Sequence, residues 1–100
     1  MQEKRVHPRV SIDISVSCEL KDRPAISGMA KDLSLGGMFI ESTEVLPFGT
    51  QLTIVARLPG MPVDSRIPAV VRWSKPGGFG AQFGSMGARE THAITRVLKY

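Results

Sequence analysis

The segment from Val10 to Leu20 alternates strictly between apolar and polar residues, and no other feature of the sequence constrains the fold as strongly. Apolar side chains at every second position lie on one face of an extended chain. A helix cannot use this pattern, whereas a β-strand with one buried face requires it. The residues predicted to face the core are Val10, Ile12, Ile14, Val16, Cys18 and Leu20.

Five further extended segments follow, separated by residues that are typical of turns. Proline, glycine and aspartate stand between them, and strands at this close spacing are typical of small antiparallel barrels. Gly28 interrupts the first of these segments and predicts a bulge there. The additional strands are predicted at residues 25–33, 38–42, 51–58, 65–73 and 79–83.

Three aromatic residues of the last two predicted strands fall at positions that the pattern assigns to the core. Trp73 shares a face with Ile67 and Val71, and Phe79 and Phe83 follow on the next segment. Single-stranded nucleic acids are bound by aromatic side chains on an exposed strand face. Because these aromatics are expected inside, we expect no DNA or RNA partner, and a steep salt dependence of binding to single strands would reopen that class.

The periodicity changes after Gly84, where the sequence predicts a helix over residues 86–99. Its apolar residues recur at helical spacing and form a single stripe. They are Ala93, Ile94, Val97 and Leu98. Two interpretations of the stripe are open: it covers one end of the barrel, or it forms a homodimer contact. The chain is therefore expected to be a monomer or a weak homodimer.

A chain of 100 residues is long enough for one domain. We predict a single all-β domain over residues 1–100, with a basic N-terminal arm at 1–9, a six-stranded antiparallel barrel at 10–84 and a C-terminal helix at 86–99. No apolar run approaches the roughly 20 residues that span a bilayer, and the N-terminus lacks the apolar centre of a secretion signal. The single cysteine cannot form an internal disulfide. These features predict a cytoplasmic protein that is not an integral membrane protein.

The sequence contains no arrangement of residues that is typical of a catalytic or metal site. His7, His92 and Cys18 lie far apart and do not form a pattern of metal ligands. Cys18 falls at a core position, where a thiol is inert. Neither a nucleophile elbow nor a phosphate-binding P-loop is present. We therefore expect no enzyme activity, no metal and no cofactor.

A basic arm precedes the first strand and carries Lys4, Arg5 and Arg9 around Pro8. Proline keeps the preceding residue out of helical geometry, so the arm is extended or turned and both arginines can converge on one anion. A guanidinium matches phosphate oxygens, or the O6/N7 edge of guanine, with two parallel hydrogen bonds. The alternative interpretation is a solvated basic terminus.

A second polar motif, Asp32-x-Ser34-x-x-Gly37, follows the second predicted strand. An aspartate and a serine two residues apart on extended backbone present a carboxylate and a hydroxyl on the same side, and a carboxylate accepts hydrogen bonds from the N–H groups of guanine. Gly36 and Gly37 permit positive φ and the close approach of a ligand. The alternative interpretation is an Asx or Ser turn between two strands.

The arginine pair of the arm, followed by the Asp32-x-Ser34-x-x-Gly37 motif, resembles the PilZ domain signature of bacterial cyclic-di-GMP receptors. The resemblance covers nearly the whole chain, because residues 71–73 and 78–83 are similar to the C-terminal strand pattern of that family. It implies a non-catalytic receptor that binds cyclic-di-GMP (c-di-GMP).

The site residues implied by this resemblance are Arg5 and Arg9 for the phosphates and guanine edges, Asp32 and Ser34 for a guanine, and Gly37, with Gly36 beside it, for the turn that admits the base. Lys4 stands where many members have an arginine, which leaves open whether one ligand molecule binds or an intercalated pair. Binding is expected to fold the arm across the barrel mouth and to present a new surface to an unidentified downstream protein.

A PilZ-like adaptor is the alternative function, with a silent nucleotide site and a protein-binding surface. Met29, Met61 or Met86 would give an adaptable surface if they are exposed, and they would fill gaps in the core if they are buried. Binding of c-di-GMP distinguishes the receptor from the adaptor.

Overall fold

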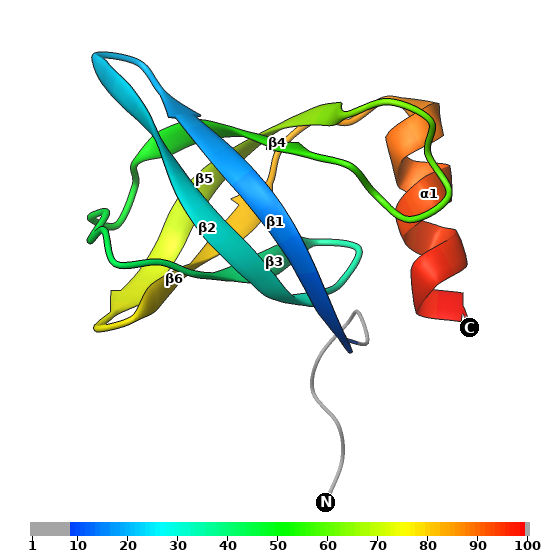
Figure 1. Cartoon of the computed structure of the whole chain (residues 1–100), viewed down its shortest axis with the longest axis horizontal. Coiled ribbons are helices and arrows are strands. Elements are labelled where there is room, and N and C mark those ends of the chain that lie inside the picture. The colour runs from blue at the N-terminus through cyan, green and yellow to red at the C-terminus, as the bar shows by residue number, and fades with distance from the viewer. Residues whose placement is uncertain (1–8, 100) are drawn as a thin grey trace, which may run out of the picture.

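Six strands and one helix make up the computed structural model, which describes residues 9–99. The elements are β1 (Val10–Leu20), β2 (Arg23–Leu33), β3 (Gly37–Glu41), β4 (Gln51–Ala56), β5 (Ser65–Lys75), β6 (Gly78–Phe83) and α1 (Ala88–Lys99). All strand pairs are antiparallel, and the sheet closes in the order β1-β2-β3-β6-β5-β4 (Figure 1). The predicted all-β fold, a six-stranded antiparallel barrel with a C-terminal helix, is confirmed.

The alternation in β1 corresponds to one buried and one solvent-facing side. Val16 and Cys18 are buried, whereas Ser11, Asp13 and Ser15 are exposed. The barrel interior is filled mainly by aliphatic side chains from all six strands, and its largest fully buried residue is Phe79. Burial of this apolar surface provides the main driving force for folding.

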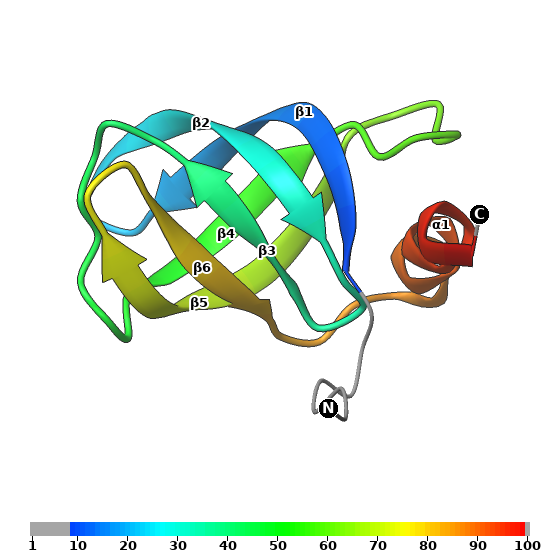
Figure 2. The same cartoon turned by 90° about the horizontal axis from the view of Figure 1, so that it is seen from below.

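Helix α1 lies at one end of the barrel, at the end where the loop between β4 and β5 also lies (Figures 1 and 2). Ala93, Ile94 and Leu98 are buried in the same core cluster as the barrel residues, and Val97 is partly buried against it. The stripe thus covers a barrel end, while the homodimer contact stays a prediction. Within residues 9–99, no helix has the length and apolarity needed to cross a membrane.

The helix begins at Ala88, two residues later than predicted. The carbonyl of Gly87 accepts hydrogen bonds from the backbone N–H of Thr91 at 3.1 Å and from its hydroxyl at 3.0 Å. Gly87 therefore occupies the position just before the first helical residue, where glycine is well tolerated, and Met86 lies outside the helix.

The bulge predicted at Gly28 is wrong. Gly28 pairs in register with Val16 of β1. A Cβ atom at this position would lie 2.5 Å from Cγ2 of Ile40 and 3.0 Å from the carbonyl oxygen of Glu41. The glycine is explained by the close approach of β3, which leaves no room for a side chain.

The core position predicted for Trp73 is also wrong. The pairing of β5 with β6 shifts between Val71, which faces Ala81, and Trp73, which faces Gly80, so that Arg72 is an extra residue on β5. One extra residue turns the following side chain to the other face of the sheet. Val71 is fully buried, whereas Trp73 is 44% exposed on the outside of the barrel. Phe79 and Phe83 are buried as predicted.

The buried thiol of Cys18 makes the stability of the domain depend on pH. Burial raises the pKa of this thiol to about 11, because the charged thiolate is poorly solvated inside the barrel. The unfolded chain loses this proton near pH 9 while the folded chain keeps it, so the free energy of unfolding falls as the pH rises from about 9 towards 11.

We expect the free energy of unfolding to fall by about 2 kcal/mol by about pH 10.5. Urea denaturation at several pH values measures it, and the variant Cys18→Ala is expected to lack this part of the loss. Equal pH dependence in both proteins would contradict the prediction.

Candidate functional site

Residues from four strands meet at a surface hollow of about 500 Å³ near the start of β1. Antiparallel pairing brings the first residues of β1 beside the last residues of β2, so that Ser11 faces Asp32. Across the next pair, Asp32 faces Phe39 of β3. The lining residues are Arg9, Val10, Ser11, Asp32, Met38, Phe39 and Trp73. Arg9 and Asp32, which the sequence assigned to two separate motifs, thus line one hollow.

Arg9 and Asp32 form an ion pair, with 2.6 Å between Nη1 and Oδ1. The same carboxylate oxygen accepts a hydrogen bond from the backbone N–H of Phe39 at 3.1 Å. Both charged side chains retain about a third of their exposure, so solvent screens the pair and its net contribution to stability is under about 1 kcal/mol. The backbone bond fixes the aspartate in position, whereas the arginine is held only weakly and can be redirected towards an anion.

Ser34 shapes the turn between β2 and β3. Its hydroxyl oxygen accepts hydrogen bonds from the backbone N–H groups of Gly36 and Gly37, each at 3.2 Å, and the N–H of Ser34 donates to the carbonyl of Gly37 at 2.8 Å. The side chain is buried. The Ser-turn interpretation therefore describes this residue correctly, and a contact between Ser34 and a guanine stays a prediction.

Gly37 lies where two strands approach closely. A Cβ atom at this position would be 2.2 Å from the carbonyl oxygen of Ala81 on β6. The glycines with positive φ are Gly49, Gly60 and Gly77, so the freedom to adopt positive φ is not used at Gly36 and Gly37. The motif needs glycine at position 37 for packing, because only a residue without a side chain fits against the β6 backbone.

A stacked pair of aromatic rings completes the hollow, and the sequence analysis missed it. The rings of Phe39 and Trp73 are nearly parallel, at 6°, with their centroids 5.3 Å apart. The Lys75 ammonium lies 5.3 Å from the Phe39 centroid and 5.7 Å from that of Trp73. One feature of the sequence could have indicated this pair of rings. Gly78 and Gly80 alternate along β6, and because neither has a side chain, rings from neighbouring strands can lie against the outer face of β6. The bulge that turns Trp73 outward is not visible in the sequence.

Two predicted ligand residues, Lys4 and Arg5, lie outside the described residues, as does His7. Within residues 9–99, no group of three or more histidine, cysteine, aspartate and glutamate side chains gathers in a way that could hold a metal ion.

The model of the PilZ domain family matches residues 3–100. This chain belongs to the PilZ domain family. The match includes both motifs and the aromatic strand β5, so the hollow described above is part of a PilZ domain.

Solved structures, including two described as PilZ domains, share this fold at low sequence identity. The PilZ domain of YcgR from Escherichia coli, solved with c-di-GMP, is 16% identical, with a TM-score of 0.77 over 97% of this chain and 90% of that one. The PilZ domain of CeSA from a cellulose synthesizing bacterium is 20% identical, with a TM-score of 0.73 over 92% and 95%. The Bacillus subtilis inhibitor of motility (MotI/DgrA) is 20% identical, with a TM-score of 0.76, and this chain spans about half of it, 51%. A search of curated proteins finds no match.

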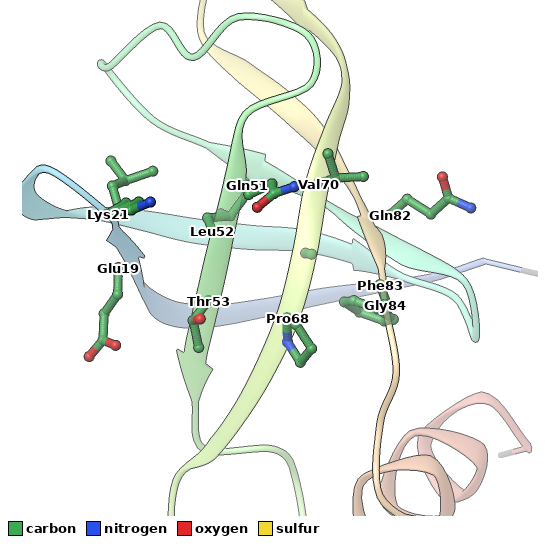
Figure 3. A pocket seen from close by; sticks show the side chains of 12 residues that line it. Glu19, Lys21, Gln51, Leu52, Thr53, Pro68, Val70, Gln82, Phe83 and Gly84 are labelled. Carbon is green, nitrogen blue, oxygen red and sulfur yellow. The ribbon is translucent and has the colours of Figure 1, made fainter.

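A second hollow of this PilZ barrel, about 520 Å³ in volume, lies on the wall formed by β4, β5 and β6, with Glu19 and Lys21 contributed by the end of β1 and the turn after it (Figure 3). Its lining residues include Gln51, Thr53 and Gln82. None of the motif residues within 9–99 lines it. Although it is slightly larger than the first hollow, it contains neither the Arg9–Asp32 ion pair nor the stacked rings of Phe39 and Trp73, so the first hollow is the candidate site.

Proposed function

We propose that this PilZ domain is a non-catalytic receptor for c-di-GMP. The observation that carries the proposal is the meeting of Arg9 and Asp32, 23 residues apart in the sequence, at one hollow. Two of the similar solved structures, the YcgR PilZ domain and Klebsiella MrkH, are described as c-di-GMP complexes. A guanidinium beside a carboxylate offers a donor for phosphate or guanine O6/N7 and an acceptor for the guanine N–H groups.

Each motif residue has a distinct part in the proposed complex. Arg5 and Arg9 bind the phosphates and guanine edges, with Lys4 adding charge. Asp32 accepts from a guanine, supported by the Phe39 N–H that already fixes its orientation. Ser34, Gly36 and Gly37 form the turn beside the base, and the hydrogen bonds of the Ser34 hydroxyl keep that turn in shape.

Ligand entry exchanges one partner of Arg9 for another. The Arg9–Asp32 pair retains about a third of its exposure, so water screens it and its disruption costs little, and a phosphate offers the arginine two acceptor oxygens for a bidentate contact in return. Because Arg9 is the last residue before β1, its movement is transmitted directly into the arm. We propose that the arm closes over the ligand and that a downstream protein recognises the closed state.

The adaptor alternative loses part of its basis. Met61 and Met86 pack against the core cluster, and Met29 is only partly exposed. Met61 and Met86 therefore contribute to packing, and none of the three methionines is fully exposed.

Isothermal titration of the purified protein with c-di-GMP tests the receptor proposal, with c-di-AMP as the matched control ligand. We expect saturable binding with a micromolar or lower Kd for c-di-GMP and weaker binding of c-di-AMP, because Asp32 accepts from N–H groups that adenine lacks. The stoichiometry distinguishes one bound molecule from an intercalated pair. Absence of heat, together with no rise in Tm at saturating ligand, would contradict the receptor and favour the adaptor with a silent site.

A further inference from the structure

We propose that the segment between β3 and β4, residues 42–50, is the contact surface of a weak twofold homodimer. Its exposed apolar side chains are Val45 and Phe48, which retain 68% and 69% of their exposure. The segment lies at the end of the barrel away from α1 (Figures 1 and 2). This inference concerns a second copy of the chain and does not depend on nucleotide binding.

The β3–β4 segment is fixed to the barrel on both sides, so its exposed side chains have a defined position. On one side, the hydroxyl of Ser42 donates to the carbonyl of Ser27 on β2 at 3.3 Å. On the other side, the N–H of Gly49 donates to the carbonyl of Val71 on β5 at 2.7 Å. Leu46, between them, is buried in the core cluster. Exposed apolar side chains that lie together are typical of protein contacts, and a fixed segment loses little conformational entropy on binding.

Opposite charges flank the apolar pair of this segment. Glu44 stands immediately before Val45, and its Oε1 accepts a hydrogen bond from Arg23 at 3.0 Å on the β2 side. Arg72 of β5 lies on the other side, with its guanidinium carbon 5.5 Å from the centroid of the Phe48 ring. None of the ion pairs in the described part of the chain includes Arg72. The surface therefore runs from a carboxylate, across two apolar side chains, to a cation.

A twofold axis between the two apolar side chains makes this surface complementary to itself. In such a contact, each group of one copy meets a different group of the other, and each meeting occurs twice. The apolar side chains of the two copies pack together, and Glu44 of each copy faces Arg72 of the other. The Glu44–Arg23 pair does not prevent this, because both side chains are about half exposed and their pairing is screened by water. An unrelated partner would need the same arrangement in reverse, whereas a second copy supplies it by symmetry.

The contact is small, so the dimer is weak. Two apolar side chains and one charged pair from each copy cover less than the roughly 1,600 Å² of a standard interface. We expect a dissociation constant of roughly 100 µM. By mass action, the chain is then mostly monomeric at about 10 µM and mostly dimeric at about 1 mM.

Sedimentation equilibrium of the purified chain without nucleotide measures the dimer over this range of concentrations. Phe48→Ser removes an apolar side chain from both halves of the contact, so the dissociation constant should rise at least about 100-fold. Val45→Ser should act in the same direction. Val63→Ser is the matched control, because Val63 is an exposed apolar residue, at 54%, in the β4–β5 loop at the other end of the barrel. It should associate as the wild type does, and circular dichroism checks the fold of each variant.

Two charge reversals test the symmetry of the contact. Glu44→Arg and Arg72→Glu each place like charges opposite one another in a homodimer, so each variant alone should stay monomeric. An equimolar mixture of the two variants has opposite charges at both meetings. The mixture should therefore form a heterodimer with a dissociation constant within about tenfold of the wild-type value.

A wild-type chain that stays monomeric up to about 1 mM would overturn the proposal. A dimer that Phe48→Ser leaves intact would also overturn it, because the contact would then lie elsewhere. An equally large loss in Val63→Ser would indicate non-specific association in place of this surface. If the mixture of folded charge variants stays monomeric, the twofold arrangement is wrong.

Discussion

Replacement of Arg9 by alanine is expected to weaken c-di-GMP binding by roughly 100-fold. The loss of a bidentate guanidinium contact costs about 1–3 kcal/mol, which corresponds to a factor of about five to 150 in Kd. The effect should lie near the upper end, because the substitution also removes the only side chain that neutralises Asp32 among the described contacts. The carboxylate would then repel the phosphates of the ligand. Isothermal titration at near-physiological salt measures the change.

Two further variants separate the geometry of Arg9 from its charge. Arg9→Lys keeps the charge and loses the planar fork, so its affinity should lie between those of the wild type and Arg9→Ala. Arg57→Ala is the control, because Arg57 pairs with Asp64 at 3.0 Å on the exposed surface and does not line the hollow. A loss of affinity as large in Arg57→Ala as in Arg9→Ala would show that net charge, rather than this site, governs binding.

Gly37→Ala is expected to lower the free energy of unfolding by about 3 kcal/mol. The new Cβ atom would lie 2.2 Å from the carbonyl oxygen of Ala81 and 3.2 Å from its carbonyl carbon. Neither atom belongs to a flexible side chain, so β3 and β6 must move apart over a pairing that includes Gly37 and Gln82. Overpacking of this kind costs about 1–3 kcal/mol and sometimes more, and Tm should fall by roughly 10–25 °C in a domain of this size.

Gly84→Ala provides the matched control for this prediction. A Cβ atom at Gly84 would lie 3.5 Å from the carbonyl oxygen of Pro68, an ordinary contact, and φ is not positive there. Its unfolding free energy should stay within about 0.5 kcal/mol of the wild type. Thermal unfolding followed by circular dichroism compares the two variants. A Gly37→Ala protein as stable as Gly84→Ala would refute the packing explanation of the motif glycine.

The fold was predictable because its strands carry a simple period. In β1, each inward position is apolar, and this pattern alone distinguishes a half-buried strand from a helix. The helix could be predicted for the same reason, from residues such as Ile94 and Leu98 that recur at helical spacing. Element boundaries shifted by a few residues where local hydrogen bonds decide them, as at Gly87.

The candidate site was predictable only in part. Arg9 and Asp32 carry chemistry that a sequence displays directly, and antiparallel pairing brings them together. Trp73 was misplaced because a bulge reverses the face of every residue after it, and the period-two pattern contains no sign of where the reversal occurs. The packing reason for Gly37 could not be predicted, because the clash with Ala81 depends on a strand that is distant in the sequence.

The closure of the sheet limits how another protein can recognise this domain. Each of the six strands is hydrogen-bonded to a neighbour on both sides over part of its length. Open edge in the described part of the chain is confined to stretches such as residues 10–15 of β1, which pair only with β2, and only there could a partner add a strand of its own. Recognition elsewhere on the barrel must depend on side chains and loops. Those can be substituted without disturbing the backbone ladder, so a barrel of this kind can acquire a new partner while the hollow lined by Arg9 and Asp32 stays the same.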